Sequence, residues 1–278
     1  MSDTIDQQKY PGAARYPYPE LERLSPSDPA YFIRREPPAD VDYEASYWGV
    51  ITDPDGNVRD RRLERDQAVA DLSEELEEIE ATLGYWRRDA TSKPAVLDVG
   101  CGLGFLLSGL SDGWEKHGLD LSHFATDFAS REYGIETFTG TLRRALEVGR
   151  YRPQSFDVVV LHHVIEHVDR PLDLMADIAA VIRPGGMLVL GTPDFDGAMA
   201  RRFGPRYRML HDPTHVSLFT LESTYRMLRD LGWAVDRVGF PYFETRHFTS
   251  ENLLRVMDTS KLSPAWPGSF MTFYCTRL

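Results

Sequence analysis

The chain has 278 residues, 42% of them hydrophobic, and its 43 acidic against 31 basic side chains give a formal net charge of −12. This length and composition predict a soluble globular protein with room for a large α/β domain and a sizeable core. No apolar stretch approaches the roughly 18 residues of a transmembrane helix, and the N-terminus lacks the apolar middle of a signal peptide, so we expect a cytoplasmic protein. Only two cysteines are present, Cys101 and Cys275, which excludes a disulfide framework and a four-cysteine zinc site.

The acidic balance disfavours a nucleic-acid partner, because the molecule as a whole would repel a phosphate backbone. One local basic cluster interrupts this balance: Arg201, Arg202, Arg206 and Arg208. A solvated loop is the simpler interpretation of the cluster, and contact with an anionic group is the alternative. We expect a small-molecule partner and no membrane association.

Residues 1–59 carry much of the proline together with several tyrosines, and predict an irregular N-terminal arm. Its stretch YEASYWG (residues 43–49) is aromatic enough that we expect it to pack on the main domain or over a ligand. The main domain would span residues 60–278 and open with a helix over residues 60–90. One face of that helix carries four apolar side chains: Leu72, Leu76, Ile79 and Leu83. A homodimer contact through this stripe is possible beside ordinary packing on the domain.

After residue 94 the pattern changes to short apolar runs separated by amphipathic stretches. The runs are AVLDVG, HGLDLS, GIETFTG, FDVVVLHH and GMLVLGTP, followed near the C-terminus by WAVDRVGF and SFMTFYCTR. Such alternation predicts parallel strands with crossover helices, an α/β layered fold whose ligand-binding core covers residues 95–193. The segments 194–220 and 240–268 would then be insertions on the substrate side.

The stretch VLDVGCGLGFLLSGL (residues 96–110) predicts a strand, a turn and a helix start, with glycines at positions 100, 102 and 104. Glycine permits unusual backbone angles there and lets a ligand approach the main chain and the helix N-terminus. The dinucleotide fingerprint has a third glycine three residues after the second, where this chain has Phe105.

Two acidic side chains accompany the loop. Asp120, at the end of the next strand, can accept hydrogen bonds from both hydroxyls of a ribose. Asp98, directly before the loop, faces a region where a positively charged amino group is more favourable than a pyrophosphate. The combination predicts a nucleoside ligand.

Four motifs in this order, DVGCGLG, GLDLS, FDVVVLHHVIEHV and IRPGGMLVLGTPD, resemble those of class I S-adenosylmethionine-dependent methyltransferases. The resemblance implies a Rossmann-like, seven-stranded, mostly parallel sheet with helices on both faces and a C-terminal antiparallel hairpin. It implies S-adenosyl-L-methionine as cofactor and S-adenosyl-L-homocysteine as product. The implied cofactor contacts are Gly100, Gly102 and Gly104 around the methionine moiety, Asp98 at its amino group, Asp120 at the ribose, Leu121 on the adenine, Thr141 and Leu142 at the adenine edge, and Leu161 and His162 on the sulfonium side.

The run HHVIEH (residues 162–167) contains H-x-x-E-H, the inverted zinc-peptidase signature. Because it follows a predicted strand at the edge where ligands bind in open α/β sheets, we expect its histidines to face the cofactor crevice, which disfavours a peptidase. The run also resembles the E-x-x-E-H segment of ubiquinone-biosynthesis O-methyltransferases, which can hold a divalent ion. A metal site of His163, Glu166 and His167 is therefore an alternative to hydrogen bonding within the fold, and we assign no metal ligand.

A second histidine pair lies in HDPTHVSLFT (residues 211–220), in a connection expected to cover the acceptor pocket. His215 is a candidate to accept a proton from an acceptor hydroxyl, whereas His211 fits a turn. The following TLES predicts an N-terminal capping box in which Glu222 is structural.

These observations predict methyl transfer to a hydroxyl oxygen, or less favourably a nitrogen, of a small molecule, with His163 and His215 as candidate bases. The C-terminal stretch RHFTSENLLRVMD, followed by SPAWPGSFMTFYCTRL, resembles methyltransferases of polysaccharide and glycosylated-metabolite pathways, which implies a sugar or a glycosylated secondary metabolite as acceptor. A regulatory protein that binds the cofactor without catalysis and a macromolecule methyltransferase remain alternatives.

Overall fold

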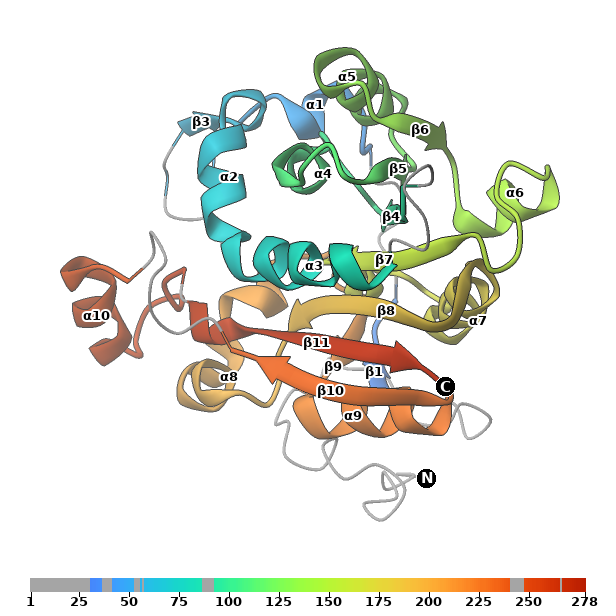
Figure 1. Ribbon diagram of the computed structural model, residues 1–278. Coiled ribbons are helices and arrows are strands. Elements are labelled where there is room, and N and C mark those ends of the chain that lie inside the picture. The colour runs from blue at the N-terminus through green and yellow to red at the C-terminus, as the bar shows by residue number, and fades with distance from the viewer. Residues whose placement is uncertain are drawn as a thin grey trace.

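A seven-stranded sheet forms the centre of the computed structural model, which describes residues 31–36, 42–52, 56, 58–86, 93–240, 248–265 and 267–278 (Figure 1). The strand order is β10-β11-β8-β7-β4-β5-β6. The parallel strands are β4 (Ala95–Val99), β5 (Glu115–Asp120), β6 (Glu136–Thr139), β7 (Phe156–His162) and β8 (Ile182–Pro193). The remaining two, β10 (Trp233–Gly239) and β11 (Phe270–Arg277), form an antiparallel hairpin, and β11 also pairs antiparallel with β8. The predicted Rossmann-like sheet and its closing hairpin are confirmed.

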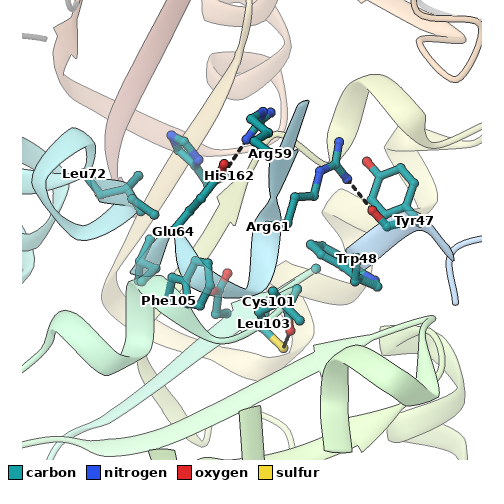
Figure 2. A pocket seen from close by; sticks show the side chains of 15 residues that line it. Tyr47, Trp48, Arg59, Arg61, Glu64, Leu72, Cys101, Leu103, Phe105 and His162 are labelled. Atoms are coloured by element: carbon teal, nitrogen blue, oxygen red, sulfur yellow. Dashed lines mark hydrogen bonds and ion pairs between the residues drawn. The ribbon is translucent and has the colours of Figure 1, made fainter. Parts of the chain in front are cut away.

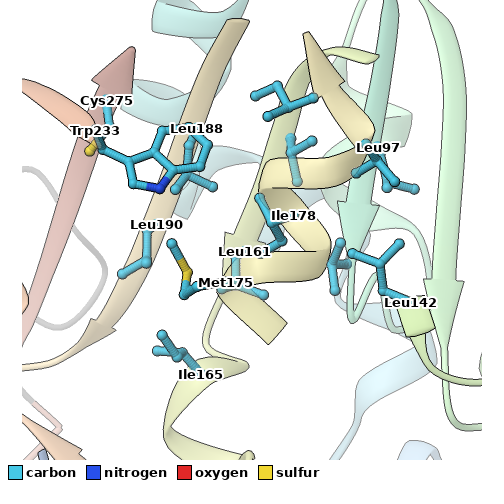
Figure 3. Close-up of a cluster of buried hydrophobic side chains, with 14 of the residues drawn as sticks. Leu97, Leu142, Leu161, Ile165, Met175, Ile178, Leu188, Leu190, Trp233 and Cys275 are labelled. Carbon is cyan, nitrogen blue, oxygen red and sulfur yellow. The ribbon is translucent and has the colours of Figure 1, made fainter. Parts of the chain in front are cut away.

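The central strands are apolar on both faces because helices cover both. In β7, Val158 and Val160 belong to one buried cluster, and the alternate residues Val159 and Leu161 belong to another. The first cluster includes side chains from α3 (Ser73–Trp86), α4 (Phe105–Gly109) and α5 (His123–Tyr133), and also Ile135, which follows α5. The second, shown in Figure 3, includes side chains from α6 (Leu142–Glu147), α7 (Pro171–Val181) and α9 (Leu221–Asp230). Burying each such aliphatic side chain contributes about 1.5–3 kcal/mol, so the sheet is a rigid support for the loops at its edge.

The leading segment is not the single helix that the periodicity predicts. It consists of β3 (Val58–Asp60), the 3-10 turn η2 (Arg61–Leu63), α2 (Arg65–Asp71) and α3, with a break at Leu72. Leu76 and Ile79 are buried against the sheet. The apolar stripe therefore packs on the core, and the homodimer stays a prediction.

The described part of the N-terminal arm also differs from the irregular structure we expected. The strand β1 (Phe32–Arg34) pairs antiparallel with β9 (Ser217–Phe219), and β2 (Val50–Thr52) pairs with β3. A short helix, α1 (Ala45–Trp48), precedes β2. The rest of the arm, residues 1–30, 37–41, 53–55 and 57, lies outside the described residues.

The segment after β8 forms a separate small core around Phe195, Phe203 and Tyr207. It contains α8 (Ala198–Phe203), η4 (Gly204–Arg206) and η5 (Arg208–His211), while α10 (Ser250–Met257) and η6 (Pro267–Ser269) follow later. The predicted capping box of α9 is present, but the side chain that returns to the Thr220 backbone is Ser223, and Glu222 is exposed. Within the described residues, no helix combines the length and the apolar character needed to span a bilayer.

Candidate active site

The glycine loop follows β4, and Asp120 at the end of the neighbouring strand β5 stabilises its conformation. Gly100, Gly102 and Gly104 all have positive φ, of 81°, 49° and 79°. At Gly102 a side chain would also clash, since a Cβ there would lie 2.6 Å from Cη2 of Trp48. The Asp120 carboxylate accepts hydrogen bonds from the backbone N–H groups of Gly102 at 3.0 Å and Ser122 at 2.9 Å. Asp120 therefore shapes the loop, a role that the sequence did not reveal.

A pocket of about 320 Å³ opens between this loop, the arm and the leading segment (Figure 2). Of the predicted cofactor contacts, Asp98, Gly100, Gly102 and His162 line it. Its other walls are Tyr47, Trp48, Arg59, Arg61, Glu64, Ala68, Leu72, Cys101, Leu103, Phe105 and Leu106. Sequence reasoning missed the contribution of residues 59–72, and the aromatic YEASYWG stretch was the only signal for Tyr47 and Trp48.

The other predicted cofactor positions, Gly104 and Asp120 included, are not among the residues that line the pocket. Leu121 is 57% exposed, and Thr141 is an exposed N-cap that accepts a hydrogen bond from the Arg144 N–H. The side chains of Leu142 and Leu161 are buried in the core. A cofactor contact at Leu142 or Leu161 must therefore come from the backbone, because their side chains are committed to packing.

The ionisable groups of the pocket suit a ligand with a cationic part. Burial, and then the neighbouring Asp120, raise the pKa of Asp98 to about 7. Burial, and then His163, lower the pKa of His162 to about 3, so this imidazole is neutral and does not repel a sulfonium. Arg61 donates to the backbone oxygen of Tyr47 at 3.0 Å, and Arg59 forms an ion pair with Glu64. The pocket lining thus combines a buried carboxyl with guanidinium groups, which suit the two charged groups of an amino acid.

The predicted base His163 lies directly after β7 in an unusual conformation. Its φ is +55°, and its backbone N–H donates to the Gly191 oxygen at 2.9 Å. Its Nδ1 lies 3.1 Å from Oε1 of Glu166, which is fully buried and whose Oε2 accepts from the Thr192 hydroxyl at 3.1 Å. Burial alone would raise the pKa of Glu166, but the hydrogen bond and charge of His163, with the charges of His167 and His215, lower it to about 2.

The two histidines of the second pair, His211 and His215, lie in different environments. His215 is buried beside His167, with 4.8 Å between ring centroids, while His211 is exposed and contacts the Pro205 oxygen. His167 Nδ1 lies 3.1 Å from the Thr214 oxygen, and His215 Nδ1 lies 2.6 Å from the Met209 oxygen. Burial lowers the pKa of His215, which favours its neutral form.

Glu166, His167 and His215 each offer one ligand atom, all within 4.8 Å of one another. The metal alternative from the sequence grouped Glu166 and His167 with His163 instead. The structure brings His215 into that group from 48 residues further along the chain, a pairing that depends on the path of the loop before β9. His163 remains attached to Glu166 by its own hydrogen bond.

The fold and the site define an α/β protein with a pocket at the carboxyl edge of a parallel sheet, where ligands bind in such folds. A family model described as "Methyltransferase domain" matches residues 61–238, so the chain belongs to that family. By this match it is a member of the class I S-adenosylmethionine-dependent methyltransferase family.

Curated relatives share part of the chain. The mitochondrial ubiquinone biosynthesis O-methyltransferase of Schizosaccharomyces pombe is 31% identical over 112 residues, which covers 39% of this chain and 41% of that protein. The ubiquinone biosynthesis O-methyltransferase of Burkholderia multivorans is 36% identical over 100 residues, which covers 34% and 43%. That of Bordetella bronchiseptica is 31% identical over 153 residues, which covers 50% and 63%. The chain thus spans less than two thirds of each relative's length.

Solved structures show the same fold. A methyltransferase described as a possible histamine N-methyltransferase from Thermotoga maritima has a TM-score of 0.54 at 18% identity, covering 78% of this chain and 94% of that one. A geranyl diphosphate methyltransferase in complex with geranyl diphosphate and sinefungin has a TM-score of 0.52 at 17% identity, covering 74% and 77%. At such identities the likeness concerns the fold alone.

Proposed function

We propose that this enzyme transfers the methyl group to a hydroxyl oxygen of a small molecule and that His163 accepts the hydroxyl proton. The main observation that supports this proposal is the position of His163 between the cofactor pocket and Glu166. Its ring meets that of the pocket residue His162 edge-on, with 4.4 Å between centroids, and its Nδ1 is held by the Glu166 carboxylate. With the Nδ1 proton donated to Glu166, Nε2 carries the lone pair of a base.

The bound cofactor supplies a methyl group that its sulfonium has already activated. The protein has to align the acceptor oxygen, exclude water and take up a proton. The side chain of His163 is about one-third exposed and can reach an acceptor, whereas His215 is almost fully buried. We therefore retain His215 as a second candidate base that requires an acceptor to enter more deeply.

The same proposal assigns the cofactor contacts. The Asp98 carboxyl would hold the amino group of the methionine moiety, and the guanidinium groups of Arg59 and Arg61 would face its carboxylate. Gly100 and Gly102 would admit the ligand close to the backbone, Asp120 would accept from the ribose hydroxyls, and Leu121 would cover the adenine. Support comes from the burial of Asp98, the lining of the pocket and the positive φ of both glycines.

Oxygen as the acceptor atom has support from the curated relatives, whose names describe O-methyl transfer in ubiquinone biosynthesis. Within that class we propose a sugar or a glycosylated metabolite, on the resemblance of residues 246–258 to methyltransferases of such pathways. The segments 194–220 and 240–268 would form the acceptor side of the site. Residues 241–247 and 266 of the second segment lie outside the described residues.

The test is methyl transfer from labelled cofactor to catechols, phenols, monosaccharides and glycosides, with primary amines to detect nitrogen transfer. With the acceptor found, His163→Gln should lower turnover on the order of 10²–10⁴-fold, the usual contribution of a general base. Its affinity for the cofactor product should stay unchanged. His211→Gln, which alters an exposed histidine outside the cluster, is the matched control.

Other outcomes would redirect the proposal. Label on amines alone would replace oxygen by nitrogen, and label found only in RNA or protein of a cell lysate would indicate a macromolecular acceptor. Cofactor binding without transfer to any acceptor would favour a regulatory role. Full turnover in His163→Gln would remove His163 as the base and leave His215 to be tested in the same way.

A further inference from the structure

A short stretch of the arm crosses the cofactor site, although it lies before the family-matched residues 61–238. We call residues 42–48 the covering segment. At one end the Tyr43 hydroxyl interacts with Thr214, in the loop before β9, and burial raises the pKa of this tyrosine. At the other end Tyr47 and Trp48 line the pocket (Figure 2). The segment thus connects the acceptor side of the molecule to the glycine loop.

Glu44 attaches the covering segment to the N-terminus of α5. Its carboxylate accepts hydrogen bonds from the backbone N–H groups of His123 at 3.1 Å and Phe124 at 3.0 Å. These N–H groups have no partner within the helix, so Glu44 satisfies them and interacts favourably with the helix dipole. The same hydrogen bonds, that of Phe124 first, lower the pKa of Glu44. The Glu44 carboxylate also accepts a hydrogen bond from the Ser122 hydroxyl. The backbone N–H of Ser122 in turn donates to Asp120.

Trp48 lies directly on the glycine loop. Its ring occupies the space that a Cβ at Gly102 would need, and the guanidinium of Arg61 lies 5.9 Å from its ring centroid and 4.2 Å from that of Tyr47. The ring edge on the loop is the apolar one, with Cη2, Cζ3 and Cζ2, and the indole Nε1 at the opposite edge is buried. Trp48 therefore offers a bound ligand apolar ring contact.

We propose that the covering segment completes the cofactor site, with the Trp48 ring packing against the bound cofactor and Glu44 holding the segment closed over it. Because the segment is attached at Glu44 through hydrogen bonds to a helix end, cofactor exchange requires these bonds to open. The inference concerns cofactor binding and release, and it does not depend on the identity of the acceptor or of the base.

The first test uses S-adenosyl-L-homocysteine as the probe, with calorimetry and tryptophan fluorescence. Trp48→Ala removes the ring, and we expect roughly tenfold weaker binding through lost apolar contact. The chain has five tryptophans, so the fluorescence change on binding should persist in Trp233→Phe, which alters a core residue, and vanish in Trp48→Ala. Unchanged affinity together with an unchanged fluorescence response in Trp48→Ala would overturn the proposal.

The second test separates closure from direct contact and does not depend on the first variant folding. In Glu44→Ala the indole remains but the attachment to α5 is lost, so release of the probe in stopped-flow experiments should be several-fold faster. Glu222→Ala, which removes an exposed glutamate from the first turn of α9, is the matched control and should release at the wild-type rate. Release from Glu44→Ala as slow as from wild type would show that the segment does not close the site.

Discussion

The Asp120 carboxylate, at the end of β5, accepts a hydrogen bond from the backbone N–H of Gly102 in the loop after β4. The side chain of Asp120 thus links the ends of β4 and β5. Its other carboxylate oxygen accepts a hydrogen bond from the backbone N–H of Ser122, at the start of α5. Burial raises the pKa of Asp120, whereas the hydrogen bonds from Ser122 and then Gly102 oppose this shift. The loop conformation and the predicted ribose contact therefore depend on the same carboxylate.

Asp120→Ala should reduce both stability and cofactor affinity. The substitution leaves the N–H groups of Gly102 and Ser122 without their acceptor, at about 1–3 kcal/mol for each group that stays buried. Asp120→Asn keeps one acceptor oxygen and should lose less of either property. Thermal unfolding and calorimetry with S-adenosyl-L-homocysteine measure the two effects, with the exposed Asp127→Ala as control. Equal melting temperatures for the alanine variant and wild type would contradict the role of Asp120 in holding the loop.

The raised pKa of Asp98 predicts that cofactor affinity depends on pH. The free site holds a proton on Asp98 below about pH 7, and a ligand amino group favours the ionised carboxylate. Affinity should therefore weaken as pH falls from 8 to 6, and Asp98→Asn should bind weakly with a flatter pH dependence. Calorimetry across this pH range tests the prediction. A wild-type cofactor affinity that does not change with pH would show that Asp98 does not bind the amino group.

The same Asp98 shift has the opposite sign for stability. A carboxyl whose folded pKa lies above its unfolded value of 3.8 destabilises the fold progressively as pH rises from about 4 to about 7. Asp98→Asn should therefore gain melting temperature relative to wild type at pH 8 and gain little at pH 4. A gain of the same size at both pH values would mean that the variant acts through packing instead.

The sheet and the loop were predictable from the sequence because both leave local signals. The alternation of Val158 and Val160 with Val159 and Leu161 reflects helices on both faces, and the loop glycines reflect positive φ. The β1–β9 pairing and the Glu44 contacts with α5 join residues about 80 to 187 positions apart, and no local pattern records such pairs. The burial of the Leu142 side chain could not be predicted for a related reason, since an apolar residue next to a site has the same sequence signature as one in the core.

Glu166→Gln should lose stability most at neutral pH. Burial opposes ionisation of Glu166, but its hydrogen bond with His163, the largest of the opposing effects, and the neighbouring imidazoles place its folded pKa near 2, below the unfolded value of 4.5. Its stabilising contribution is complete above about pH 4.5 and is lost as pH falls toward 2. Urea unfolding in the presence of chelator should show a difference between variant and wild type that shrinks from pH 7 to pH 3, with the exposed Glu222→Gln as control. A stability difference that stays constant with pH would show that the variant acts through side-chain packing and not through the charge of Glu166.

The group of Glu166, His167 and His215 predicts that the protein can take up a transition-metal ion. Both histidines have Nδ1 at a backbone oxygen, the arrangement that leaves Nε2 available and is usual for metal-binding histidines. Two imidazoles and one carboxylate suit Zn²⁺ better than Mg²⁺, which prefers oxygen ligands. After incubation with zinc and dialysis, elemental analysis should find about one ion per chain, and His215→Asn should lose it while the exposed His211→Asn retains it. Protein that holds no zinc after this treatment would assign the cluster to hydrogen bonding alone, and turnover unchanged by a chelator would show that a bound ion takes no part in methyl transfer.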